Sequence, residues 1–272
     1  MLGKLTKYEF MASAKNFLPL YGAIIIISII NRIFVFSDII SLSNNSAQIL
    51  VNAGQFFDFI MMMLFFAIVV AIGVITLLAV IQRFYKNLYC DQGYLMHTLP
   101  VHKWQLIASK LTVSVVWIIS SGIVIMISLF ILFANSNFIF DLFKGIIDLF
   151  KMFGFATFLE GIVLTIVACC STVLSIYAAI SVGHMFNSFK VLWSFGAYVV
   201  FSLIESNIVF FGINILDKVF NVFNVLMSTD IHVLVTRTPH VILALLIAYE
   251  LMTAVVYFFI SHIIMDKKLN LQ

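Results

Sequence analysis

The chain contains few charged residues. Asp, Glu, Lys and Arg make up 10% of its 272 residues, whereas soluble domains contain about 25%. Hydrophobic residues make up 63% of the chain, and the mean hydropathy is +1.16. This balance excludes an ordinary soluble domain and predicts an integral membrane protein.

Strict alternation of polar and apolar residues is also lacking. A membrane β-barrel needs such alternation in segments of about ten residues, but residues 24–30 and 61–70 are continuously apolar. We therefore predict an all-α fold in which the spans are helices. A cleavable signal peptide is not expected, because the apolar run after Lys15 exceeds the roughly 7–15 residues of a signal-peptide core.

Motifs for nucleotide or metal chemistry are missing as well. No Gly-x-x-x-x-Gly-Lys-[Ser/Thr] phosphate loop occurs, so the chain is not expected to hydrolyse ATP by that route. The cysteines form no pattern, since Cys90 is in a polar segment and Cys169 and Cys170 are adjacent in an apolar run. His97 and His102 lack further metal ligands. We expect no catalytic residue, metal ion or cofactor on this chain.

Six apolar stretches have the length of about 20 residues that is needed to cross a membrane. They are residues 17–36, 57–81, 111–134, 155–182, 191–213 and 241–264. An even number of spans places both termini on the same side of the membrane.

Basic residues predict which side this is. With both termini inside, ten basic residues fall on the inner side: Lys4, Lys7, Lys15, Arg83, Lys86, Lys103, Lys110, Lys190, Lys267 and Lys268. Five fall on the outer side or at its edge: Arg32, Lys144, Lys151, Lys218 and Arg237. The positive-inside rule then places both termini, and the loop of residues 83–110, in the cytoplasm.

Residues 1–16 are predicted to form a separate amphipathic helix. In a helical arrangement, apolar Leu2, Leu5 and Tyr8 lie opposite basic Lys4, Lys7 and Lys15. This pattern is typical of a helix on the inner membrane surface, with its lysines near anionic lipid. The alternative is a positive flank that only sets the orientation. Residues 17–272 would form the six-helix domain.

The polar segment of residues 83–110 separates the second span from the third. Thr98 and Pro100 resemble a helix N-cap followed by a first-turn proline, which predicts a new helix near Pro100. Four apolar residues precede it: Tyr94, Leu95, Met96 and Leu99. Exposed apolar groups with a polar rim indicate a docking surface. The alternative is that they fold back onto their own helix ends.

Acidic residues inside apolar spans are further candidates, because a charge at the bilayer centre costs about 2.5–3.5 kcal/mol. Glu160, Glu205 and Glu250 lie within or at the ends of the last three spans. We expect the first two near the outer surface and Glu250 deepest, as the candidate for substrate binding or conformational change. Met62, in a run of three methionines, is a candidate for substrate contact. Packing or lipid contact is the alternative for both.

Two motifs support a family resemblance. The N-terminal Leu-Gly-Lys-Leu-x-Lys-Tyr-Glu-Phe and the Gly-Tyr-Leu-Met-His-Thr-Leu-Pro-Val of residues 93–101, together with the six-span layout, resemble the ABC-2 type permease subunits of bacterial ABC exporters. The resemblance implies an interfacial N-terminal helix and a cytoplasmic coupling helix that contacts a separate ATP-binding subunit. It implies that this contact is centred on Tyr94, Leu95, Met96, His97, Thr98, Leu99 and Pro100.

By this resemblance the chain is a multi-pass permease subunit of an ATP-driven exporter in the bacterial cell membrane. ATP and Mg would be bound by the partner ATPase, and a second permease, identical or different, would complete a dimer. The expected cargo is an amphipathic peptide or a hydrophobic drug, exported for resistance or self-protection. No nucleic-acid partner is expected. The alternatives are an ion-coupled secondary transporter that uses the three glutamates, and a membrane sensor or scaffold that moves no solute.

Overall fold

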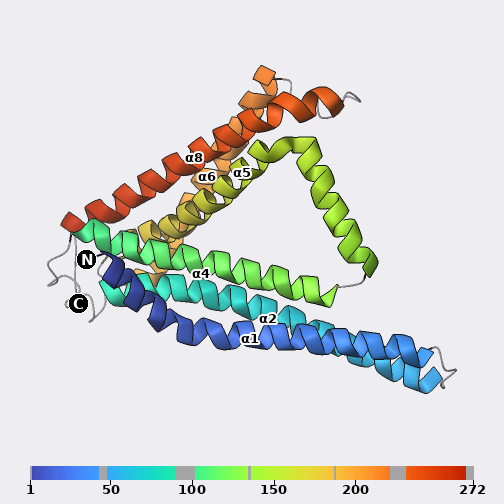
Figure 1. Cartoon of the computed structure of the whole chain (residues 1–272). Coiled ribbons are helices and arrows are strands. Elements are labelled where there is room, and N and C mark those ends of the chain that lie inside the picture. Colours follow the sequence, from blue (N-terminus) through green and yellow to red (C-terminus); the bar gives the residue numbers. More distant parts are fainter. Residues whose placement is uncertain are drawn as a thin grey trace. The chain divides into compact units, whose positions relative to one another are not determined.

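The computed structural model describes residues 2–42, 48–89, 102–133, 136–186, 188–220 and 231–267. This part of the chain consists of helices and their connections (Figure 1). The helices are α1 (Leu2–Leu42), α2 (Gln48–Leu88), α4 (Lys103–Leu132), α5 (Ser136–Gly183), α6 (Lys190–Phe220) and α8 (Ile231–Lys267).

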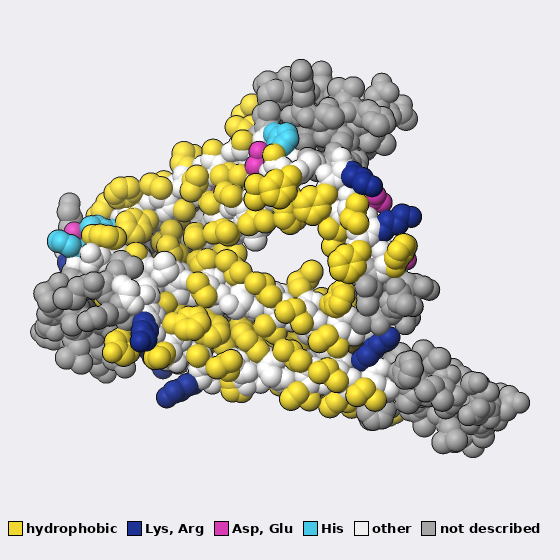
Figure 2. All heavy atoms as spheres, viewed as in Figure 1, with side chains coloured by type: hydrophobic (Ala, Val, Ile, Leu, Met, Phe, Trp, Pro, Cys, Tyr) yellow, Lys and Arg dark blue, Asp and Glu magenta, His cyan; other side chains and the backbone are white. Residues whose placement is uncertain are grey.

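Each of these helices contains a stretch that is long and apolar enough to cross a membrane. The stretches are Leu5–Ile33, Phe59–Leu88, Lys103–Leu132, Gly154–Gly183, Lys190–Ile215 and Ile242–Asp266. The shortest has 25 residues, which corresponds to about 37 Å of helix against a hydrocarbon core of about 30 Å. On the face shown in Figure 2, hydrophobic side chains cover most of the described surface. The predicted all-α architecture with six apolar helices is confirmed.

The chain divides into two compact units. The first contains Met1–Val80 and Thr112–Lys144, and the second contains Ile81–Leu111 and Gly145–Gln272. Three of the long helices therefore contribute to both units, because α2 changes unit after Val80, α4 after Leu111 and α5 after Lys144. The segment that connects α2 to α4 belongs to the second unit.

The first unit is a bundle of α1, α2 and α4, which lie side by side (Figure 1). Its core contains Phe17, Tyr21 and Ile24 of α1, which are spaced by four and three residues and so lie on one helix face. Opposite them, Trp117 of α4 stacks on Phe17 with ring centroids 4.6 Å apart. This apolar stripe explains why α1 packs along its length, while its other faces remain open to lipid.

Small polar groups join the helices of this bundle. The hydroxyl oxygens of Tyr21 and Ser121 are 2.7 Å apart, and that of Ser121 is 3.2 Å from Thr76 Oγ1. One hydroxyl network thus joins α1, α2 and α4. Hydroxyl groups commonly join transmembrane helices in this way, because lipid offers them no other partner.

The N-terminal segment differs from the prediction in one respect. Residues 2–15 are helical, but α1 continues through Pro19 into the first apolar stretch without a break. The helix bends in its first part (Figure 1), as expected where proline removes a backbone hydrogen bond without ending the helix. The predicted separate helix is therefore the beginning of α1.

The second unit is built around α5, with α8 and α6 against it. From Ser171 to Gly183, α5 is buried on nearly all sides, whereas most α6 side chains are exposed. At Gly154 the backbone has φ 80° and ψ 162°, a conformation that is essentially restricted to glycine. The long helix therefore bends sharply at this residue (Figure 1).

Candidate functional site

A cavity of about 520 Å³ lies between α5, α6 and α8 of the second unit. We call it the polar cavity. It is lined by Ser171, Thr172 and Ser175 of α5, by Tyr198, Ser202, Glu205, Ser206, Val209, Phe210 and Ile213 of α6, and by Tyr249 and Glu250 of α8. Most of these side chains are polar, although all three helices are apolar overall.

Helical spacing explains why these residues share one cavity. Along α6, Tyr198, Ser202, Glu205 and Val209 are separated by three or four residues, so they form one stripe on the helix. Ser171 and Ser175 are four apart on α5 and face the same space. The polar side chains are thus concentrated on the faces that the three helices turn toward one another.

Hydrogen bonds connect the walls of the polar cavity. The Ser171 hydroxyl donates to Glu250 Oε2 over 2.5 Å, which joins α5 to α8. The Tyr249 hydroxyl donates to the backbone carbonyl of Glu205 over 3.5 Å, which joins α8 to α6. The phenol groups of Tyr249 and Tyr257 also interact electrostatically with both carboxylates. Glu250 therefore holds a fixed position, and the two carboxylates belong to one site.

Both glutamates lie well inside their apolar stretches. Glu205 is ten residues before Ile215, or about 15 Å of helix, and Glu250 is eight residues after Ile242, or about 12 Å. The location of Glu205 near the outer surface stays a prediction, and α6 remains helical and apolar for ten residues beyond it. Glu205 is therefore at least as deep in its helix as Glu250.

The polar cavity is amphipathic along α6. Its hydroxyl and carboxylate groups lie along residues 198–206, and Val209, Phe210 and Ile213 continue the same wall toward the end of the apolar stretch. A ligand that follows this wall meets a polar region next to an apolar one. This arrangement suits a molecule with one polar or charged group and an apolar arm.

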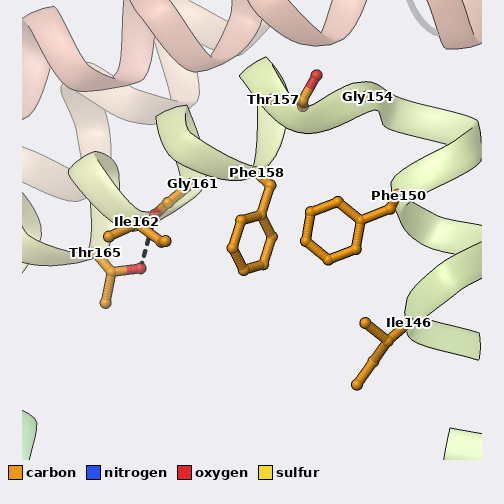
Figure 3. Close-up of a pocket in the computed structure, with 8 residues that line it drawn as sticks. All are labelled: Ile146, Phe150, Gly154, Thr157, Phe158, Gly161, Ile162 and Thr165. Carbon is orange, nitrogen blue, oxygen red and sulfur yellow. Dashed lines mark hydrogen bonds between the residues drawn. The ribbon is translucent and has the colours of Figure 1, made fainter. Parts of the chain in front are cut away.

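A second, apolar cavity of about 490 Å³ lies inside the bend of α5 (Figure 3). Phe150 and Phe158 face each other from the two sides of Gly154, with ring centroids 4.7 Å apart. Ile146 and Ile162 extend the apolar lining (Figure 3). Its walls offer little polar specificity, so we do not assign it a ligand.

Thr157 also lines this cavity (Figure 3). Its hydroxyl oxygen lies 3.3 Å from Nε2 of His240 in α8. Nδ1 of the same imidazole lies 3.0 Å from Glu160 Oε2. The bend of α5 is thus joined to α8, and the Glu160 carboxylate has a basic partner.

The end of α2 is packed against the end of α5. Phe84 stacks on Tyr177 with centroids 3.9 Å apart, and the Tyr89 hydroxyl donates to Ser181 Oγ over 2.8 Å. Burial raises the pKa of Tyr89 to about 12, although the bond to Ser181 opposes this. His184 lies 4.4 Å from the Tyr89 ring. The end of α2 and Tyr89, which precede residues 90–101, are therefore fixed to the helix that carries Ser171 and Ser175.

The beginning of α4 is fixed to the end of α8. Lys103 Nζ lies 2.8 Å from Asp266 Oδ1 and donates to the Met265 carbonyl over 3.2 Å. The start of α4 is therefore joined to the helix that carries Glu250. The described residues on both sides of residues 90–101 are thus connected to helices that line the polar cavity, and residues 90–101 lie outside the described part of the chain.

Comparison of the chain with protein-family models, with curated proteins and with solved structures gives no match. The functional assignment therefore rests on the residues described above and on the sequence motifs.

The predicted site residues have different outcomes. Glu250 lines the polar cavity. Met62 is exposed on α2 and lines neither of the cavities described above. The docking residues Tyr94, Leu95, Met96, His97, Thr98, Leu99 and Pro100 lie outside the described residues, as does Cys90. In the described part of the chain, no group of three His, Cys, Asp or Glu side chains is placed to hold a metal ion.

Sequence reasoning missed the rest of the polar cavity. It did not identify Ser171, Tyr198, Ser202 or Tyr249 as site residues. One signal was available, because Tyr198, Ser202, Glu205 and Ser206 form a polar stripe with helical spacing in an apolar span. The serines of α5 carry no such signal, since isolated serines are common where transmembrane helices pack.

Proposed function

We propose that this chain is the permease subunit of an ATP-driven exporter of the bacterial cell membrane, with both termini in the cytoplasm. The polar cavity is the observation that carries the transport assignment. Two carboxylates inside apolar helices are costly to maintain, and a cavity between them provides room for a solute. The cargo we propose is an amphipathic peptide or a hydrophobic drug.

The 90–101 segment is the proposed docking site for the ATP-binding subunit, which holds ATP and Mg. A second permease subunit completes the working unit. Closure of the ATPase pair would push on this segment, whose ends are joined to α5 through Tyr89 and to α8 through Lys103. Those helices form walls of the polar cavity, so the push shifts the balance between two arrangements of the site. Export follows if the cargo binds one arrangement more tightly than the other.

Docking is tested by co-expressing the chain with a P-loop ATPase encoded beside it and purifying the complex. We expect Leu95→Asp and Leu99→Asp to abolish ATPase co-purification, because a buried unpaired charge opposes an apolar contact. Leu95→Met and Leu99→Met keep the apolar surface and should retain the ATPase. Full retention by the aspartate variants, with normal membrane insertion, would show that the docking assignment is wrong.

Glu205 and Glu250 also favour a second candidate, transport driven by an ion gradient. Transport assays in proteoliposomes distinguish the two energy sources. ATP-driven export requires the ATPase and hydrolysable nucleotide and survives a protonophore. A gradient-driven carrier works without the ATPase and stops when the gradient is collapsed.

A further inference from the structure

We propose that the polar cavity recognises organic cations that carry apolar groups. The inference rests on the proposed function for placing the cavity on a transport path, and it assigns the class of cargo. The positive charge would lie between Glu205 and Glu250, with the apolar part along Val209, Phe210 and Ile213.

The first argument is that, among the described residues, neither carboxylate has a basic counter-charge. At the ends of the second unit, Glu160 is paired with His240 and Asp266 with Lys103. Within the described residues, Glu205 and Glu250 form no ion pair with a basic side chain. Glu160 and Asp266, at the ends of the unit, therefore have basic partners, whereas Glu205 and Glu250, in its middle, have none among the described residues.

The sequence of the three helices strengthens this contrast. In the apolar stretches of α5, α6 and α8, the only basic residues are Lys190, at the start of α6, and His262, near the end of α8. Neither lines the polar cavity. An uncompensated carboxylate in apolar surroundings is unfavourable, and a cationic ligand supplies the missing charge.

The remaining lining distinguishes an organic cation from a metal ion. A metal ion needs several oxygen ligands at about 2.0–2.6 Å, whereas this cavity holds about 520 Å³ and has an apolar end. Tyr198, Tyr249 and Phe210 offer aromatic rings, which attract organic cations through their π-electron faces. Charge, size and amphipathic walls therefore fit the same class of ligand.

The test uses the purified chain in lipid nanodiscs without any ATPase. Its probes are tetraphenylphosphonium and tetraphenylborate, which have nearly the same shape and opposite charge, and binding is measured by equilibrium dialysis. We expect the cation to bind saturably and tetraphenylborate to show only lipid partitioning. Glu205→Gln and Glu250→Gln should each weaken cation binding at least tenfold, a change that corresponds to about 1.4 kcal/mol.

The matched control is Glu160→Gln, which removes a carboxylate of the same unit that does not line the cavity. It should leave cation affinity within about twofold of the unmodified chain, a small free-energy change. Equal binding of both probes, or wild-type affinity in the two cavity variants, would overturn the proposal. The binding test contains no ATPase, so its failure is distinguishable from a failure of ATPase docking. If the chain co-purifies with its ATPase but does not bind the cation, the exporter assignment still holds and only the cargo class is wrong.

Discussion

At the scale of single residues, His184 is the clearest example of a group controlled by its surroundings. Its Nδ1 donates to the Ile180 carbonyl over 2.8 Å, and its ring contacts the rings of Tyr85 and Tyr89, with centroid distances of 5.2 and 4.4 Å. Burial lowers the pKa of His184, the Ile180 hydrogen bond opposes this, and the Lys190 charge lowers it further. The imidazole therefore stays neutral at pH values where it would be protonated in the unfolded chain.

This environment predicts that stability depends on pH. Below about pH 6.5, the ordinary pKa of histidine, the unfolded chain binds a proton that folded His184 does not. Unfolding then becomes easier as the pH falls toward the lowered pKa, by at most about 1.4 kcal/mol per pH unit. His184→Asn keeps a donor for the Ile180 carbonyl. It should reduce the difference between the melting temperatures measured at pH 7 and at pH 5. His102→Asn, at an exposed position, should leave the pH dependence unchanged, and an equal effect of both variants would contradict the prediction.

Single residues also show what the sequence can predict. Glu250 is recognisable because a carboxylate in an apolar span requires an explanation. Its partner Ser171 is not, since the bond between them joins positions 79 residues apart. Local periodicity determines which residues share a helix face, whereas the contacts between α5, α6 and α8 depend on how those faces pack.

At the scale of helices, the corner between α5 and α6 depends on a close approach. The backbone carbonyl of Gly183 accepts a hydrogen bond from the Phe186 amide over 3.3 Å, and the Phe186 ring stacks on Trp193 with centroids 4.3 Å apart. A Cβ at Gly183 would lie 1.9 Å from Ser194 Oγ and 2.7 Å from the Lys190 carbonyl oxygen. The first turn of α6 therefore sits where only glycine leaves room.

We predict that Gly183→Ala destabilises the protein by about 1–3 kcal/mol, because backbone atoms of α6 cannot move aside as a flexible side chain would. Gly161→Ala is the matched control in α5, since a Cβ there meets nothing within 4 Å. Alanine should be neutral or stabilise the helix by up to about 1 kcal/mol at that position. Thermal unfolding in detergent compares the two variants, and similar melting temperatures would show that the corner is not tightly packed.

The sequence predicts the positions of the helices better than the positions at which they bend or end. Continuous apolar runs determine six spans, and the structure contains an apolar helix at each. The bend at Gly154 was not predicted, because the sequence permits glycine in a straight helix as well as at a bend. Lys15 and Pro19 do not end a helix either, because α1 stays helical through both residues.

At the scale of the whole molecule, the proposed function requires residues 90–101, which we propose to be cytoplasmic, to act on the polar cavity. Tyr89, just before these residues, is bonded to α5, and Lys103, just after them, is bonded to α8. In the same helices, Ser171 and Glu250 form one wall of the polar cavity. A displacement of the segment therefore has a continuous route through two rigid helices to the site.

The Lys103–Asp266 pair tests this route. Its side chains are 35% and 47% exposed, so the pair contributes at most about 1 kcal/mol and its loss should barely change the melting temperature.

We predict that Lys103→Met and Asp266→Asn retain the ATPase but reduce ATP-driven transport by up to about fivefold, the equivalent of that free energy. The double variant should be no worse than Lys103→Met alone, because that change already removes the Lys103–Asp266 pair together with the bond to the Met265 carbonyl. Lys7→Met, at an exposed position of α1, is the control. Additive effects of Lys103 and Asp266, or an equal loss in the control, would show that coupling does not pass through this contact.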